Sequence, residues 1–180
     1  YLKNALTKLR RKSMNVNDNL SFLKVTDENT ISNFKKLMLL YAPELDIHQN
    51  RTTPTEIIVK WTDSIIKQQD DTDRFLEVCY VDEKAVGFVY GKIDRPHHKG
   101  YIRPNWGYVM EFFVLPEYRR YGIGKKMFLR LEKYFKSNGT EGIYLTSDPI
   151  TGKPFWEALG FVTTGEFSNE NGQEVFEKSW

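Results

Sequence analysis

Residues 106–139 constrain the fold of this chain more than any other segment. They consist of an apolar run, WGYVMEFFV, a turn, LPEYRRYGIG, and an amphipathic run, KKMFLRLEKYFKSNG. The apolar run is typical of a buried strand. In the last run Met127, Leu131 and Phe135 recur at helical spacing, and Gly139 stands where a helix ends. The segment therefore predicts a strand, a glycine turn and a helix in immediate succession.

This arrangement predicts an anion-binding turn. The first N–H groups of a helix have no partner within the helix, and the helix dipole favours negative charge at that end. Gly122 and Gly124 have no Cβ atom that would keep a phosphate away from these N–H groups. Four basic side chains add positive charge at the same place: Arg119, Arg120, Lys125 and Lys126. A phosphate or pyrophosphate group is the ligand that suits such a turn.

The spacing of the turn excludes two common nucleotide-binding motifs. A Walker P-loop has Ser or Thr after its Gly-Lys pair, but Lys126 follows here, and Arg119 stands where that motif has its first glycine. A dinucleotide fingerprint needs G-x-G-x-x-G, which the turn lacks. The pattern that remains is R-x-x-G-x-G.

The segments before this turn predict further elements of one mixed domain. Residues 21–26 alternate like a half-buried strand, and Asp27 is the expected N-cap of a helix that Pro43 ends. After a polar loop, Thr53 is expected to cap a second helix. Residues 74–93 then predict a β-hairpin.

The loop over residues 94–105, with two prolines and two histidines, is expected to be exposed. Beyond the central segment we expect a strand at 142–147, a short helix at 155–160 and a final hairpin that turns at 169–172. The complete order is β-α-α-β-β-β-α-β-α-β-β. The chain contains no internal repeat and no linker, so one α+β domain is predicted.

Composition and charge narrow the class of protein. Hydrophobic residues make up 40% of the chain and charged residues 28%, which is typical of a folded enzyme rather than a disordered segment. The net charge of +2 is too small to indicate a nucleic acid partner. The lone Cys79 excludes an internal disulfide and a multi-cysteine zinc site, and His97-His98 have no third ligand at a suitable spacing, so no metal is expected.

The basic stretch 1–19 is expected to be a peripheral extension without a catalytic role, and residues 20–180 are expected to form the domain. The sequence has no apolar run approaching the roughly 20 residues that span a bilayer. No membrane partner is therefore expected, and a cytoplasmic location is the simplest expectation.

The turn and the segments around it resemble those of the GNAT superfamily of N-acetyltransferases. The family signature is a strand that ends in valine, then x-P-x-x-[QR]-x-x-G-x-[GA] at the start of a helix. The matching positions are Val114, Pro116, Arg119, Gly122 and Gly124. Downstream, PFWEALGF resembles the family's aromatic helix-to-strand segment. The resemblance covers the chain from residue 21 to its end.

The resemblance implies a fold and a cofactor. The fold is an α/β/α sandwich with a mixed, mostly antiparallel sheet of about seven strands, whose splayed central strands hold acyl-CoA. Acetyl-CoA would lie along residues 112–114 and place its pyrophosphate on the N–H groups of residues 119–125. The implied cofactor-binding residues are Phe112, Phe113, Val114, Arg119, Arg120, Tyr121, Gly122, Ile123, Gly124, Lys125 and Trp156.

The resemblance also implies direct transfer of the acetyl group to an amine, with Glu111 as general base. Many relatives have a tyrosine as general acid in the last helix, but here the aromatic pair is Phe155-Trp156, and an indole N–H has no accessible acidity. The candidates for that role are Tyr121, which we include among the catalytic residues, Tyr144, Ser147 and water. The asparagine that relatives often carry before this helix is also absent, because the corresponding residues 148–151 are Asp-Pro-Ile-Thr.

The expected acceptor is a primary amine of a small molecule or a peptide. Acids and aromatic rings in the loops suit an amine through charge pairing and cation–π contact. The candidates are Glu44, Asp46, His48, Trp61, His97, His98, Trp106 and Tyr108. A second hypothesis is a regulatory module that binds acyl-CoA with little turnover, and Trp156 is the feature that favours it. A homodimer is left open as the assembly state.

Overall fold

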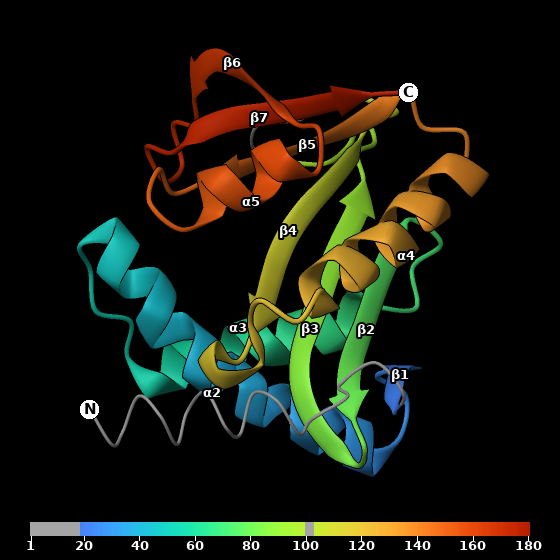
Figure 1. The fold of residues 1–180 in the computed structure, drawn as a ribbon, viewed down its shortest axis with the longest axis vertical. Helices are drawn as coiled ribbons and strands as arrows, with labels where there is room; N and C mark the ends of the chain where they lie inside the picture. The colour runs from blue at the N-terminus through green and yellow to red at the C-terminus, as the bar shows by residue number, and fades with distance from the viewer. Residues whose placement is uncertain (1–18, 100–102) are drawn as a thin grey trace.

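The computed structural model of the chain describes residues 19–99 and 103–180, so nearly all of the predicted extension at 1–19 lies outside it. The described residues form seven strands in one sheet and four α-helices (Figure 1). The strands are β1 (Leu20–Lys24), β2 (Arg74–Val81), β3 (Lys84–Ile93), β4 (Gly107–Val114), β5 (Gly142–Ser147), β6 (Val162–Phe167) and β7 (Glu174–Ser179). The helices are α2 (Glu28–Gln49), α3 (Thr55–Gln68), α4 (Ile123–Ser137) and α5 (Gly152–Ala158), and a short 3-10 helix, Pro116–Tyr118, precedes α4.

The predicted element order and the α+β sandwich are confirmed. The strand order is β1-β2-β3-β4-β5-β7-β6, and every neighbouring pair is antiparallel except β4 and β5, which are parallel. Phe34 of α2 packs edge-on against Phe88 on one face of the sheet. On the other face Trp156 of α5 contacts Phe112 of β4 and Phe128 of α4. Two layers of helices therefore enclose the sheet.

The two central strands diverge. Parallel pairing between β4 and β5 is limited to Gly107 with Ile143 and Tyr108 with Tyr144, at the start of both strands. The pairing of β4 with β3 also skips Met110, which leaves a bulge that bends β4. In Figure 1, β5 and β7 cross the top of the view, whereas β2, β3 and β4 run steeply below them. The sheet thus opens along the C-terminal half of β4.

Helix α4 lies close to the sheet because glycine removes side chains from its path. Met127, Leu131 and Phe135 are completely buried, as the helical spacing predicts. A Cβ atom on Gly107 would lie 2.4 Å from the ring of Phe135, so only glycine permits this approach. Gly139 follows the end of α4 with a φ of +71°, in agreement with the predicted stop.

The predicted end of α2 at Pro43 is wrong, because the helix continues through the proline to Gln49. Proline removes one backbone N–H donor, and the next turns compensate for that loss. Ala42 is buried against the core, and Asn50 closes the helix in a left-handed conformation, with its N–H bonded to the carbonyl of Asp46. The predicted polar loop after Pro43 is therefore the last part of α2.

The predicted capping role of Thr53 is also wrong. Its N–H and its hydroxyl both donate to the carboxylate of Asp46, at 2.6 and 2.8 Å, and Arg51 donates to the same carboxylate. Helix α3 begins at Thr55 after Pro54, with no side-chain cap. The hydroxyl group of Thr53, which the sequence pattern predicts as the cap of α3, therefore donates to the buried carboxylate of Asp46 in α2.

The expectation of an exposed loop at 94–105 is wrong for its first residue. Asp94 is completely buried, with its carboxylate 3.0 Å from the Lys92 ammonium. The N–H of Arg103 and the hydroxyl of Tyr144 donate to the same carboxylate. His98 lies beside it, with only 10% of its side chain exposed. Asp94 and His98 therefore point inward, whereas His97 and Lys99 of the same loop are exposed.

Candidate active site

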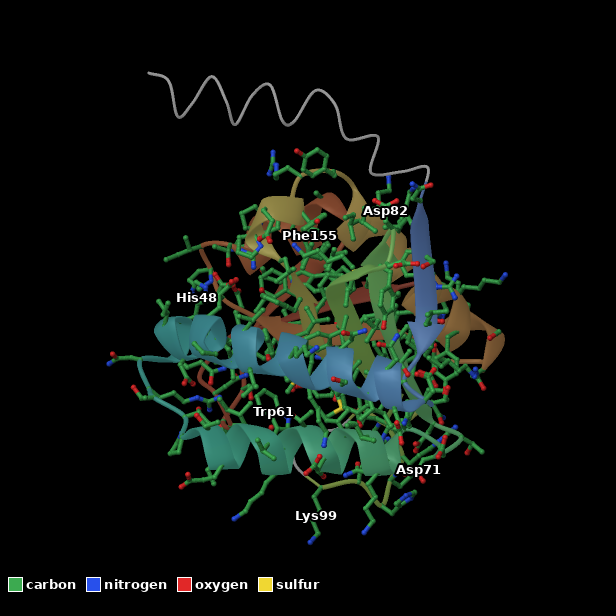
Figure 2. The ribbon with its side chains drawn as sticks, turned by 90° about the horizontal axis from the view of Figure 1, so that it is seen from below. His48, Trp61, Asp71, Asp82, Lys99 and Phe155 are labelled. Atoms are coloured by element: carbon green, nitrogen blue, oxygen red, sulfur yellow. The ribbon has the colours of Figure 1, made fainter. Side chains whose placement is uncertain are left out.

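A cleft of about 430 Å³ lies where β4 and β5 diverge. The end of α2 forms one side, and the turn before α4, the loop after β5 and helix α5 form the others. Figure 2 shows His48 at the end of α2 and Phe155 of α5 on the same side of the molecule. The residues that line the cleft and carry its chemistry are Tyr41, Glu44, His48, Met110, Phe112, Phe113, Val114, Arg119, Arg120, Gly124, Ser147, Asp148, Phe155, Trp156 and Gln173.

The glycine turn presents backbone donors at one end of this cleft. Gly122 is the N-cap of α4 with a φ of +80°, a conformation that favours glycine, and Arg120 has a φ of +69°. The N–H of Lys126 makes the first bond of the helix, to the carbonyl of Gly122. Within the described chain, no N–H from Arg120 to Lys125 donates to another protein group. These donors are available to a ligand.

The residues present fit the expected pyrophosphate of coenzyme A. A Cβ atom on Gly124 would lie 3.1 Å from two ring atoms of Phe155, so glycine keeps this corner of the cleft open. Arg120 and Gly124 both line the cleft, next to the unpaired N–H groups. Because the helix dipole is positive at this end, an anion that bridges these N–H groups is stabilised.

Arg119, the arginine of the sequence signature, is held by protein groups. Its terminal nitrogen Nη2 lies 2.7 Å from both carboxylate oxygens of Glu44, and its Nε donates to the carbonyl of Val114 at 2.7 Å. The guanidinium therefore joins three elements: α2, the end of β4 and the glycine turn. The sequence predicts that Arg119 binds the cofactor; in the fold it lines the cleft, and its side chain also fixes the turn that carries the N–H donors.

Glu111 lies on the sheet face that α2 covers, opposite to the side of Phe112. Its Oε2 accepts a hydrogen bond from the hydroxyl of Tyr41 at 2.7 Å. Burial raises the pKa of Glu111 to about 8, although the Tyr41 hydrogen bond and the charge of Arg51 each lower it. Glu111 is thus a carboxyl group that gains or loses a proton near neutral pH, the property that a general base needs.

Tyr41 is the residue that sequence reasoning missed. The helical pattern indicates a core residue, and its ring does pack between Trp61, Phe88 and Phe113. The hydroxyl at the end of that ring nevertheless reaches Glu111, and the residue lines the cleft. No local sequence signal distinguishes it, because its partner lies 70 positions away.

Trp156 is part of an aromatic cluster beside the cleft. Its ring lies 4.8 to 5.9 Å from those of Phe112, Phe128, Phe155 and Phe161, and the residue is only 6% exposed. These contacts describe a packing residue that also forms part of the cleft wall.

The structure separates the candidates for the general acid. Ser147 lines the cleft, while Tyr144 is completely buried and donates to Asp94. Tyr121 packs against the core and is not among the described residues that line the cleft. Asp148, in place of the absent asparagine, accepts hydrogen bonds from the N–H groups of Ile150, Thr151 and Gly152. Asp148 therefore shapes the start of α5.

Two of the eight candidate acceptor residues line the cleft, namely Glu44 and His48. The ring of His48 lies 3.8 Å from the carboxylate of Asp148, across the cleft from α2 to the loop after β5. Asp46 is bound to Thr53 and Arg51, and Trp61 lies between α2 and α3 (Figure 2). The other four candidates, His97, His98, Trp106 and Tyr108, are not among the described residues that line the cleft.

Two general properties follow from the described part of the chain. No group of three His, Cys, Asp or Glu side chains there could hold a metal ion. None of its helices is long and apolar enough to cross a membrane.

Comparisons with known proteins agree with this architecture. A solved structure of PaiA N-acetyltransferase from Thermoplasma acidophilum in complex with coenzyme A has a TM-score of 0.64 and 20% identity, and the match covers 89% of this chain and 99% of that chain. AAC(6')-Iy in complex with the bisubstrate analogue CoA-S-monomethyl-acetylneamine has a TM-score of 0.64 and 16% identity, over 82% of this chain and 93% of that chain.

A third structure, aminoglycoside 6'-acetyltransferase type Ii, has a TM-score of 0.65 and 18% identity, over 89% of this chain and 96% of that chain. No curated protein sequence matches the chain. A sequence model of the acetyltransferase (GNAT) family matches residues 35–161, which include Glu111, the glycine turn and α5. The chain belongs to the GNAT acetyltransferase family, and it is an acetyltransferase that uses acetyl-CoA.

Proposed function

We propose that the protein transfers an acetyl group directly from acetyl-CoA to a primary amine of a small molecule or a peptide, in a ternary complex. The observation that carries this proposal is the arrangement of one cleft. The free backbone N–H groups of residues 120–125 lie at one end of the cleft. Tyr41, whose hydroxyl donates a hydrogen bond to the carboxyl group of Glu111, forms part of the cleft wall. Two structural neighbours are named as aminoglycoside acetyltransferases or carry an aminoglycoside analogue, which supports an amine acceptor.

The turn binds the pyrophosphate in this proposal. The N–H groups of residues 120–125 hold it, because the N–H of Arg119 is bonded to the carbonyl of Pro116. The side chains of Phe112, Val114 and Trp156 line the path of the pantetheine arm. Bound acetyl-CoA supplies an activated acyl group as a thioester. Beyond the first residues of β4, no pairing with β5 occupies the backbone of residues 112–114. The carbonyl of Val114 accepts the bond from Arg119, and the other backbone groups on this edge can pair with a ligand that adds as a strand.

Glu111 is the general base in this proposal. An amine acceptor is mostly protonated at neutral pH and must lose a proton before it attacks a carbonyl carbon. Transfer from an ammonium of pKa about 10.4 to a carboxylate of pKa about 8 costs about 3 kcal/mol. That cost is small compared with the barrier that the enzyme lowers. An ordinary carboxylate of pKa 4.5 would make the transfer much more costly.

Two further roles complete the proposal. A backbone N–H near Phe112 or Phe113 polarises the acetyl carbonyl, because a fixed donor aimed at developing negative charge stabilises the transition state. Ser147 is the hydroxyl group among the candidate acids that lines the cleft, and it or a water molecule protonates the leaving thiolate.

The proposal is tested by thiol release from acetyl-CoA over a panel of primary amines, followed by Glu111→Gln on the best acceptor. We expect kcat/KM of the variant to fall about 10²-fold or more, with the affinity for acetyl-CoA nearly unchanged. The wild-type kcat/KM should rise with pH and level off above about 8, and this acidic limb should disappear in the variant.

The matched control is Glu83→Gln, which removes a carboxylate from the exposed turn between β2 and β3. It should behave as wild type. A Glu111→Gln enzyme with the wild-type limb and with kcat/KM within about threefold of wild type would show that the base lies elsewhere.

A further inference from the structure

Tyr41 and Glu111 differ in their position relative to the cleft. Tyr41 is one of the residues that line the cleft, whereas Glu111 is not among the described residues that do so. The hydroxyl of Tyr41 donates to Glu111 at 2.7 Å, a short and well-formed hydrogen bond. Tyr41 therefore connects the cleft to the carboxylate of Glu111, and its hydroxyl oxygen keeps lone pairs that can accept a hydrogen bond from a bound acceptor.

The ring of Tyr41 is held in this position from several sides. It lies 5.5 Å from the rings of Phe88 and Phe113 and 6.1 Å from that of Trp61. These contacts come from two strands and from α3, so the hydroxyl has little freedom to turn away from Glu111. Other ionisable groups that interact with the pair through their charge are Glu44, Arg51, Tyr90 and Tyr108.

From this geometry we propose that Tyr41 is the proton relay between the acceptor ammonium and Glu111. The proposal rests on the function proposed above, with Glu111 as the base. The acceptor ammonium gives a proton to the phenol oxygen of Tyr41 as the phenol proton moves to the carboxylate. One N–H and one O–H bond break, and two O–H bonds form. The products are a neutral amine, an unchanged tyrosine and a protonated Glu111.

The pKa values of the two groups are consistent with this exchange. Burial and the nearby charge of Glu111 raise the pKa of Tyr41 well above its usual value, so the residue does not act as a free phenolate. It conducts a proton only by accepting one as it donates another. The carboxyl group is the site where the proton remains.

The direct test is Tyr41→Phe, which removes the hydroxyl and keeps the ring. We expect kcat/KM to fall about 10²-fold, with KM for acetyl-CoA unchanged. The acidic limb should move to higher pH, because Glu111 loses the hydrogen bond that lowers its pKa. The double variant with Glu111→Gln should be no slower than Glu111→Gln alone, since both residues serve one proton path.

The control is Tyr134→Phe, which removes a tyrosine hydroxyl that donates to the carbonyl of Thr72, away from the cleft. It should leave kcat/KM and the pH profile unchanged. A test on the wild-type enzyme does not depend on any variant folding. A relay moves two protons together, so kcat/KM should depend non-linearly on the fraction of D2O.

The outcomes separate the two proposals. A large loss in Glu111→Gln without a loss in Tyr41→Phe, or a linear dependence on D2O, would overturn the relay and leave the base in place. Losses that multiply in the double variant would also overturn the relay. No loss in Glu111→Gln would remove the base, and the relay with it.

Discussion

The side chain of Glu111 lies in a buried place that favours its neutral form. It lies on a central strand beneath α2, where burial opposes ionisation, and the hydrogen bond from Tyr41 offsets only part of that effect. A carboxyl group in such a place lowers the stability of the folded protein whenever it is charged. Its position beside a cleft in which the proposed reaction needs a proton acceptor gives a physical reason for that cost.

The cost should be measurable as a dependence of stability on pH. Glu111 has a pKa of about 8 in the folded chain and an ordinary value near 4.5 when unfolded, so the folded state binds the proton more tightly. The free energy of unfolding should therefore fall as pH rises from 4.5 to 8 and stay level above that range. Glu111→Gln does not titrate. Relative to wild type it should be more stable at pH 9 than at pH 5.

We expect that difference to be on the order of 2 kcal/mol, less than the full shift implies, because part of Glu111 remains exposed. Urea unfolding of both proteins at pH 5 and pH 9 measures it. The same stability difference at both pH values would contradict the raised pKa.

At the scale of elements, the two glycines of the turn serve different purposes. Gly122 has a positive φ, and an added Cβ would meet no protein atom within 4 Å. Gly124 has no such backbone requirement, but an added Cβ would press against Phe155 of α5. One glycine sets the direction in which the chain enters α4, and the other sets the distance between α4 and α5.

Gly122→Ala should weaken the binding of acetyl-CoA about tenfold or more, equivalent to about 1.4 kcal/mol. An alanine at a positive φ is strained, and relief of that strain rotates the N–H groups that we propose to hold the pyrophosphate. Calorimetric titration with acetyl-CoA measures the change.

Gly139→Ala is the matched control for this variant. It has a similar φ of +71° and equally open surroundings, but it follows the other end of α4. It should lose a comparable amount of stability and keep its affinity for acetyl-CoA. Equal affinities in all three proteins would argue against the turn as the pyrophosphate site.

At the scale of the whole molecule, the ion pair between Glu44 and Arg119 joins α2 to the cofactor turn across 75 positions of sequence. The bond from Arg119 to the carbonyl of Val114 includes β4 in the same unit. The wall that holds Tyr41 and the turn that carries the N–H donors are therefore mechanically linked. The continuation of α2 past Pro43 is what places Glu44 within reach.

This link predicts thermodynamic coupling in the binding of acetyl-CoA. Glu44→Gln and Arg119→Gln should each raise its Kd roughly three- to tenfold, as suits an ion pair whose side chains are about one-third exposed. The double variant should be no weaker than Arg119→Gln alone, because each change breaks the same pair. Calorimetry on the four proteins completes the cycle. A loss from Arg119→Gln that is equally large in the Glu44→Gln background would instead indicate direct contact between Arg119 and the phosphates.

Much of this fold depends on local patterns, and the sequence by itself determines these patterns. Alternation, helical spacing and glycine positions predict the order of all the described strands and helices, because each pattern concerns neighbours along the chain. The signature from Val114 to Gly124 likewise predicts the turn, since a strand end, a glycine turn and a helix start are consecutive. The capping box of Asp27 with Thr30 is a further local feature, and the N-cap at Asp27 is confirmed.

Only the tertiary structure decided which of these elements face each other. Pro43 breaks a helix in isolation, but burial of Ala42 and the bonds around Asp46 keep α2 intact. The pairing of Tyr41 with Glu111 joins residues that share no local signal. The same is true of the bond between Arg119 and Glu44. Such contacts depend on how α2 packs across the opening between β4 and β5, and packing is a property of the whole core rather than of any one segment.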